Sequence, residues 1–161
     1  MAENALVGVW KLVSCDATRK NGTRIPIYGK RPVGRLFYDA AGNMSVHIMK
    51  SGRRRCESET KFGASDEEMK AAYEGYEAYF SKYAVDTERR TINHKVLGSL
   101  FPNWTGSTQT RYYAFDRDNR LVLSTEPIGA SRSENTTVRR VWERLELRIR
   151  RNAAGYRIAH R

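Results

Sequence analysis

The residue whose type and setting best suit acid–base chemistry is His94, in the polar stretch 90–97. On an extended strand His94 shares a face with Ile92 and Val96, so we expect its imidazole to point inward among aliphatic side chains. An imidazole titrates at about pH 6.5, which suits proton transfer to or from a bound molecule. The alternative is a core histidine satisfied by one or two hydrogen bonds. No Ser/His/Asp order and no partner carboxylate in the sequence decides between these hypotheses.

The other two histidines give weaker indications. His47 lies in the predicted hairpin 34–50 and is interpreted either as a polar group of a mixed cavity or as an exposed residue. His160 lies near the end of the sequence, where we expect it in solvent. Three scattered histidines, without a His-x-His or Cys-x-x-Cys spacing, predict no metal site.

Cysteine usage and nucleotide-binding motifs exclude further chemistry. Cys15 ends an apolar strand and Cys56 lies in a basic loop, and both are interpreted as free thiols of a reducing compartment. The sequence contains neither a dinucleotide-binding fingerprint nor a P-loop. We therefore expect no nicotinamide, flavin or ATP chemistry and no cofactor.

A cation is the second candidate for binding chemistry. In the stretch 109–116, Arg111 shares a face with Gln109 and Tyr113. If this face is interior, Arg111 is a buried cation that needs a counter-charge, which an acidic or enolate ligand can provide. If the strand is reversed, Arg111 faces water.

The elements that must position these residues are short strands. Alternating apolar residues and turn signals predict strands at 5–15, 34–50 (a hairpin), 82–87, 90–97, 109–116, 119–126 and 137–145. With no βαβ unit and a length that suits one domain, about eight or nine strands indicate an antiparallel barrel or sandwich.

One helix interrupts the strands. Ser65 and Glu68 form a predicted capping box, and we expect the helix to cover residues 65–81. An apolar-aromatic stripe with helical spacing predicts one buried face. The stripe consists of Met69, Tyr73, Tyr76, Phe80 and Tyr83. It is interpreted either as core packing or as a lid whose tyrosine hydroxyls and Phe80 ring contact a ligand.

The loop after the histidine strand is unusually apolar for a solvated segment. It contains Leu100, Phe101, Pro102, Asn103 and Trp104 in succession. We expect Phe101 and Trp104 to fold over a barrel mouth or under the helix. Asn103 either caps a turn or reaches the ligand.

The chain is strongly basic, with a net charge of +11. One arginine cluster lies at 53–55 and eight arginines lie between 139 and 161. This charge raises the hypothesis of nucleic-acid or acidic-partner binding through the Arg-rich C-terminus. No recognition-helix, zinc-finger, KH or RRM signature accompanies it, so a solvated basic face is the favoured interpretation.

Sequence composition also bears on the compartment. No run of about 18 apolar residues predicts a membrane span, and residues 1–4 do not begin a secretory signal. We therefore expect a cytoplasmic protein without membrane contact, as a monomer or homodimer. The weakly patterned residues 146–161 are predicted to be a basic tail or peripheral strand outside a 1–145 domain.

Several motifs resemble a known family. Gly8-Val9-Trp10 is the Gly-x-Trp pattern of lipocalin-type barrels, in which the Trp closes one end and an Arg of the last strand stacks on it. Arg139, Arg140 and Arg144 are the candidates for that stacking.

Longer stretches strengthen the resemblance. "GVWKLVS", "PVGRLFYDAAGNMSVHIM", "YEAYFSKYAVD" and "GSLFPNWTG" occur in this order and resemble the small bacterial and fungal lipocalin-like domain family. The resemblance spans about residues 6–145. It implies a mainly β, closed antiparallel barrel with an internal cavity and a covering helix. Some related barrels fold or cyclise intermediates of natural-product pathways.

Together these observations predict a cofactor-free barrel that binds a small aromatic or amphipathic molecule, acidic in one version of the hypothesis. The alternative is a non-redox isomerase, cyclase or dehydratase in which His94 and a Tyr transfer protons. The residues expected to contact the molecule are Tyr38, His47, Tyr73, Tyr76, Phe80, Tyr83, His94, Phe101, Asn103, Trp104, Arg111 and Tyr113.

Overall fold

The computed structural model describes residues 5–126 and 136–145, together with the backbone of 148–151 and 157–160. Nine strands form one antiparallel sheet in the order β2-β1-β3-β4-β5-β6-β7-β8-β9, and β9 pairs back onto β1. The strands are β1 (Gly8–Thr18), β2 (Arg24–Pro26), β3 (Val33–Tyr38), β4 (Asn43–Met49), β5 (Tyr76–Asp86), β6 (Thr91–Ser99), β7 (Thr108–Phe115), β8 (Leu121–Ser124) and β9 (Thr137–Arg144).

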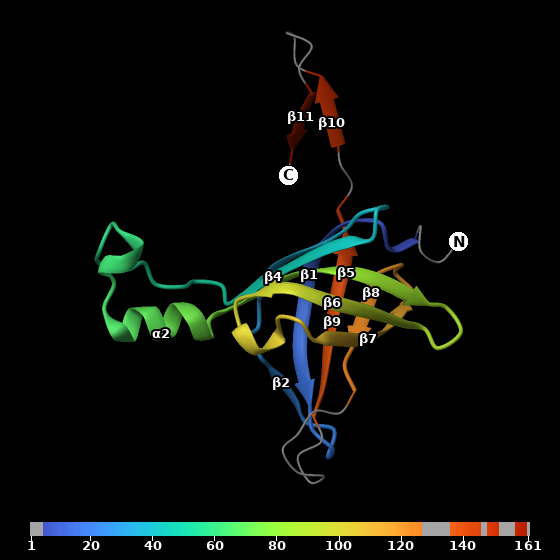
Figure 1. Ribbon diagram of the computed structural model, residues 1–161, viewed down its shortest axis with the longest axis horizontal. Helices are drawn as coiled ribbons and strands as arrows, with labels where there is room; N and C mark the ends of the chain where they lie inside the picture. Colours follow the sequence, from blue (N-terminus) through green and yellow to red (C-terminus); the bar gives the residue numbers. More distant parts are fainter. Residues whose placement is uncertain (1–4, 127–135, 146–147, 152–156, 161) are drawn as a thin grey trace.

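The pairing of β1 with β9 closes eight strands into a barrel, and β2 is an extra strand on the edge of β1 (Figure 1). Closure removes the free edges that an open sheet would expose. The predicted mainly β, closed antiparallel barrel is therefore confirmed, with strand bounds that differ from the predicted ones by a few residues.

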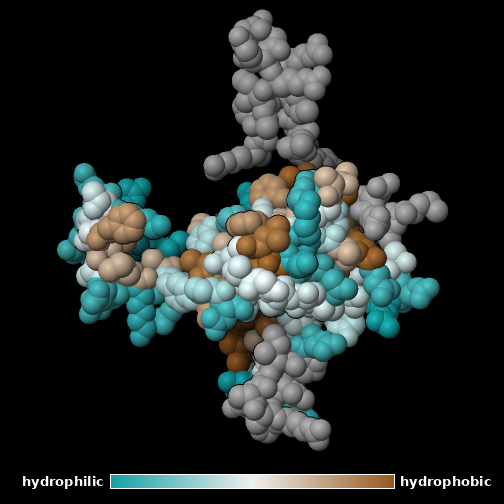
Figure 2. All heavy atoms as spheres, viewed as in Figure 1, coloured by the Kyte–Doolittle hydropathy of each residue, from teal (hydrophilic) through white to brown (hydrophobic). Residues whose placement is uncertain are grey.

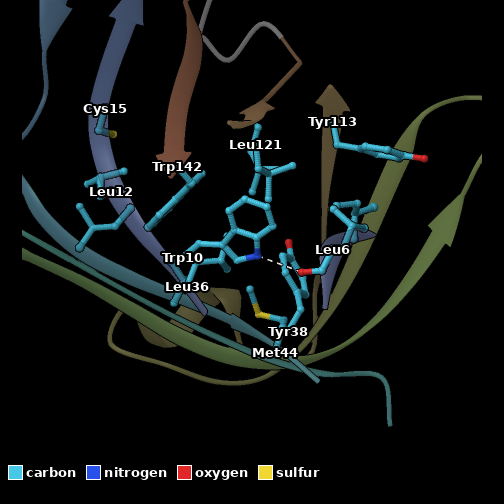
Figure 3. Packing of buried hydrophobic residues seen from close by; sticks show 14 of the residues in the cluster. Leu6, Trp10, Leu12, Cys15, Leu36, Tyr38, Met44, Tyr113, Leu121 and Trp142 are labelled. Carbon is cyan, nitrogen blue, oxygen red and sulfur yellow. Dashed lines mark hydrogen bonds between the residues drawn. The ribbon is translucent and has the colours of Figure 1, made fainter. Parts of the chain in front are cut away.

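The core follows from the alternation of side chains along each strand. In β3, for example, Gly34, Leu36 and Tyr38 are buried while Val33 and Phe37 are exposed. Figure 3 shows these inward side chains gathered around the indole of Trp10. The surrounding residues labelled there include Leu6, Leu12, Leu36, Met44, Leu121 and Trp142.

One end of the barrel is closed by a small constellation that we call the capped end: residues 5–7 with Gly8, Trp10 and Arg144. The Arg144 guanidinium lies 4.1 Å from the centroid of the Trp10 ring. It donates hydrogen bonds to the carbonyl oxygens of Val7, at 2.7 Å, and of Ala5. The predicted stacking of a last-strand arginine on Trp10 is confirmed, and Arg144 is the residue that provides it.

The helix is shorter than predicted. Helix α2 spans Asp66–Glu74, and the predicted capping box between Ser65 and Glu68 is present. Gly75 ends the helix and β5 begins at Tyr76, so the expectation of a helix continuing to residue 81 is wrong. Residues 76–86 form a strand and not a continued helix because they pair with β4 on one side and β6 on the other. Two ladders satisfy more backbone groups than a further helical turn in solvent would.

Helix α2 also does not cover the barrel as a packed lid. None of its residues is buried, and it projects away from the strands (Figure 1). Its apolar residues Met69 and Tyr73 are 43% and 45% exposed, and Phe62 in the preceding 3-10 turn, Lys61–Gly63, is 90% exposed. Figure 2 shows apolar surface on this projecting lobe among hydrophilic residues.

Beyond β9, β10 (Arg148–Arg151) and β11 (Arg157–His160) pair with each other in a separate two-stranded sheet. The division of the chain at residue 145 stays a prediction, and the side chains of the Arg-rich tail, His160 included, lie outside the described residues. No helix in the described part of the chain is long and apolar enough to cross a membrane.

Candidate functional site

The centre of the barrel contains a polar chain built on His94. The Tyr38 hydroxyl lies 2.8 Å from His94 Nε2, and the Tyr79 hydroxyl lies 3.0 Å from His94 Nδ1. Tyr79 and His94 lie on the neighbouring strands β5 and β6. Tyr38 lies on β3, which is not a neighbour of β6, and reaches His94 across the interior. The inward direction predicted for His94 is confirmed, since its side chain is 1% exposed.

Burial keeps the imidazole neutral. Desolvation, with the positive charges of Arg111 and Arg140 as smaller causes, lowers the pKa of His94 to about 3. A neutral imidazole donates one hydrogen bond and accepts one, so one tyrosine donates to His94 and the other accepts from it. Both ring nitrogens are therefore engaged by tyrosine hydroxyls, and neither is free to contact a bound molecule directly.

A second polar group joins β5 to β9. Arg140 Nη2 donates to both carboxylate oxygens of Glu77, at 2.8 and 3.0 Å, and the Tyr28 hydroxyl donates to Glu77 at 3.1 Å. Burial is the largest single effect and would lower the pKa of Arg140, but the Glu77 carboxylate together with Cys15 and Tyr79 outweighs it, so the pKa is raised. Arg140 and Glu77 thus form a neutral, buried ion pair that joins distant parts of the chain.

Arg111 lies in the same interior without such a partner. Its side chain is 6% exposed, so the hypothesis that Arg111 faces inward holds and the reversed strand is excluded. It donates to the carbonyl oxygen of Thr110 at 2.9 Å and to the amide oxygen of Gln109 at 3.3 Å. Both acceptors are neutral, and Nε has no hydrogen-bond partner among the described residues.

At the end of the barrel opposite the capped end, β5 begins and β6 ends around a recess of about 200 Å³. We call its rim the mouth: Tyr28, Tyr73, Tyr76, Leu100, Phe101 and Trp104. Glu77 and Ala78 form the inner wall, and Glu74, the last residue of α2, also lines the recess. Trp104 packs edge-on against Tyr79 at 5.9 Å and against Phe101 at 5.7 Å between ring centroids. The aromatic loop predicted to fold over a barrel mouth does lie there, and Tyr79 connects it to the His94 chain.

The other predicted contact residues lie elsewhere. His47 and Phe80 point outward; His47 Nδ1 lies 3.0 Å from the Tyr76 hydroxyl on the outer surface, and Phe80 is 55% exposed. Neither belongs to the interior site, because β4 and β5 turn the opposite faces inward. Asn103 is exposed in the 3-10 turn Pro102–Trp104.

Two further tyrosines lie away from the mouth. The Tyr83 hydroxyl donates to the carbonyl oxygen of Asp39 at 2.7 Å, and its ring packs on Tyr38 at 4.7 Å. Tyr113 is buried beside Leu6 in the core shown in Figure 3. Both positions are better explained by packing than by contact with a molecule at the mouth.

Four interior residues were not among the predicted contact residues: Tyr28, Glu77, Tyr79 and Arg140. Glu77 and Tyr79 were assigned to the helix, although reading 76–86 as a strand places both on the inner face. Arg140 was predicted either as a partner for Trp10 or as part of the basic cluster 139–161, not as an interior residue. Tyr28 follows the short β2, where no periodicity marks it.

The described residues contain no group of three His, Cys, Asp or Glu side chains that could hold a metal ion. The chemistry that this interior can perform is hydrogen bonding, proton relay through Tyr38, His94 and Tyr79, and stabilisation of negative charge by Arg111.

The closed barrel, the Trp–Arg cap and a recess at the opposite end define a lipocalin-like protein. The sequence matches the family described as "lipocalin-like domain" over residues 7–145, so the chain belongs to this family. A curated relative is the 4'-hydroxy-3'-methoxypropiophenone carrier protein ppsC of Aspergillus oryzae, 29% identical over 94 residues. The match covers 55% of this chain and 85% of that protein.

Proposed function

We propose that the protein is a carrier that binds one small aromatic molecule at the mouth of the barrel. The observation that carries this proposal is the recess of about 200 Å³, whose rim is formed by aromatic and aliphatic side chains. Its inner wall presents the Glu77 carboxylate. An apolar concavity with a few polar groups at one side is the usual form of a small-molecule site.

The size of the recess limits the ligand. Pockets for drug-sized molecules measure roughly 300–1,000 Å³, so a recess of about 200 Å³ suits a single substituted ring. Edge-to-face contacts with Trp104 and Phe101 would favour an aromatic ring over an aliphatic chain.

The relative from Aspergillus oryzae supports the same ligand class. Its name describes a carrier of a propiophenone with one hydroxyl and one methoxy group on the ring. We extend this class, a one-ring hydroxyaryl ketone, to the present chain as a proposal.

A second candidate function is proton-transfer catalysis on such a molecule, as an isomerase, cyclase or dehydratase. The observation in its favour is the Tyr38–His94–Tyr79 chain, in which the two hydroxyl oxygens lie 2.8 and 3.0 Å from the two imidazole nitrogens. In this version Tyr79, which contacts Trp104 of the mouth, exchanges the proton with the substrate. When Tyr79 donates its proton to the substrate, His94 replaces that proton and takes one from the Tyr38 hydroxyl. The Tyr38 phenolate is stabilised by Arg111 and regains its proton along the same chain when the substrate returns a proton to Tyr79.

Binding is tested by calorimetric titration of the purified protein with 4'-hydroxy-3'-methoxypropiophenone. We expect saturable binding that weakens at least about tenfold in Trp104→Ala, since the ring loses its aromatic wall. The matched control is Phe37→Ala, which removes an aromatic ring 39% exposed on the outer face of β3. Equal affinities of the two variants, or no saturable binding by the wild type, would contradict the proposal.

The carrier and the enzyme are separated by recovering the probe after long incubation and analysing it by mass spectrometry and chromatography. A carrier returns the probe unchanged. An enzyme returns an isomer or a dehydrated product, whose formation stops in Tyr79→Phe. Product formation that persists in Tyr79→Phe and in His94→Ala would exclude the proposed proton relay.

A further inference from the structure

We infer that the barrel takes its aromatic ligand as an anion, with an ionised ring oxygen held against Arg111 in the interior and the ring at the mouth. This inference rests on the proposed function and names the chemical form of the ligand. It is supported by the excess of positive charge in the interior and by the hydrogen-bond donors of buried arginines that have no partner among the residues that the structure describes.

The interior contains more positive than negative charge. Glu77 uses both carboxylate oxygens for Arg140 and one also for Tyr28, so this carboxylate is fully engaged. Arg111 has no ion pair among the described residues, and its hydrogen bonds to Thr110, Gln109 and the Tyr79 hydroxyl all involve neutral groups. The described part of the interior therefore contains two buried guanidinium groups and one carboxylate, which pairs with Arg140 and not with Arg111.

No neighbouring group in the described part of the chain supplies the missing charge. The titratable and charged groups that face Arg111 are Tyr38, Glu77, Tyr79, His94 and Arg140. Burial raises the pKa of both tyrosines, which keeps them as neutral phenols, and His94 is neutral. An arginine does not lose its proton near neutral pH. A buried cation without a counter-charge costs several kcal/mol, so a charged ligand oxygen would relieve a real penalty.

Unpartnered donors in the interior point to the same conclusion. The Nε atoms of Arg111 and Arg140 and the Nε1 atom of Trp142 have no hydrogen-bond partner in the described part of the chain. All three side chains are at least nine-tenths buried. Buried donors in native proteins are nearly always satisfied, and an anionic oxygen is a strong acceptor for a guanidinium N–H such as Arg111 Nε–H.

The interior is linked to the mouth through Tyr79. The Tyr79 ring contacts Trp104 of the mouth, and its hydroxyl lies in the electrostatic field of Arg111. A single-ring phenol bound in the recess beside Trp104 would place its ring among the apolar side chains of the mouth and its oxygen towards Arg111. The phenolic proton leaves to solvent when the oxygen ionises.

The test compares two probes of the same shape. 4'-Hydroxy-3'-methoxypropiophenone can ionise, whereas 3',4'-dimethoxypropiophenone cannot. At a pH at which the free phenol is protonated, we expect the bound phenol to show the longer-wavelength absorption of its phenolate. We also expect it to bind at least about tenfold more tightly than the ether.

A variant assigns the effect to Arg111. Arg111→Met keeps an unbranched side chain and removes the charge, and we expect the phenolate absorption to disappear and the two probes to bind equally. The control Arg35→Met removes an arginine of β3 that donates only to the Gly34 carbonyl, and it should leave the absorption unchanged.

The outcomes distinguish the inference from the proposed function. If both probes bind the wild type with similar affinity and no phenolate absorption appears, the inference is overturned and the carrier function stands. If neither probe binds, both fail. This comparison needs only the wild-type protein, so it remains decisive even where Arg111→Met does not fold.

Discussion

The two ends of the barrel use arginine in opposite ways. At the capped end, Arg144 stacks on Trp10 and donates to the carbonyl oxygens of Val7 and Ala5. The Trp10 indole nitrogen in turn donates to the Leu6 carbonyl at 2.9 Å. In the interior behind the mouth, Arg111 is buried with neutral acceptors only and with an unpartnered Nε.

Under the proposed function, this difference separates groups that stabilise the fold from groups that bind the ligand. A buried polar group with all its partners contributes to one defined structure, whereas a buried cation without a counter-charge destabilises the chain that contains it. Removing residues of the capped end should therefore reduce stability. Removing residues of the mouth or interior should mainly change binding.

The largest expected effect on stability is that of Trp10→Ala. Trp10 is fully buried among core residues, so we expect the free energy of unfolding to fall by about 3–5 kcal/mol, the usual cost of deleting a core aromatic side chain. Urea denaturation followed by circular dichroism measures this loss. Trp104→Ala, at the partly buried mouth, should lose roughly 1 kcal/mol and most of the ligand affinity. Equal losses of stability in the two variants would contradict the division between the ends.

The capped end was predictable from sequence because its signal is local. Gly8 and Trp10 are two residues apart on one strand, and only the choice among three arginines of the last strand was left open. The alternation in 90–97 likewise predicted an inward face, which the structure confirms for His94.

The interior site was less predictable because its contacts join residues far apart in sequence. Glu77 and Arg140 are 63 positions apart, and Tyr38 and His94 are 56 apart. Met69 and the aromatic residues at 73, 76, 80 and 83 fit a helical period that continues past Gly75, where the helix in fact ends. The strand was decided by its partners β4 and β6, which a local pattern does not contain.

The second expected effect is a dependence of stability on pH that comes from His94. Its pKa is about 3 in the folded chain and about 6.5 when exposed, so the unfolded chain binds an extra proton between these values. The stabilisation is complete above about pH 6.5 and is lost as the pH falls, by about 3 kcal/mol at pH 4.5. Urea denaturation at a series of pH values measures this slope.

The control for this prediction is His94→Gln, whose amide can bridge the two tyrosine hydroxyls but does not titrate. Carboxylates such as Glu77 contribute to acid sensitivity in both proteins, so the difference between the two slopes isolates His94. A capped end that contains no histidine should not contribute to this difference. Parallel slopes for wild type and variant would show that His94 does not carry the effect.

The smallest effect tests why the capped end requires glycine before its tryptophan. Gly8 has φ 144°, and a Cβ atom added there would lie 2.5 Å from Arg144 Nη1. Gly8→Ala should therefore combine backbone strain with displacement of the guanidinium, at a cost of about 1–3 kcal/mol in the free energy of unfolding.

Gly22→Ala is the matched control, because Gly22 has φ 82° but an added Cβ would meet no atom within 4 Å. It should show the backbone strain alone, and Gly8→Ala should exceed it. In an Arg144→Ala background the obstructing guanidinium is absent, so the cost of Gly8→Ala should fall towards that of Gly22→Ala. If the cost is the same with and without Arg144, glycine is required at position 8 only by the backbone conformation of β1, and not by the space that Arg144 occupies.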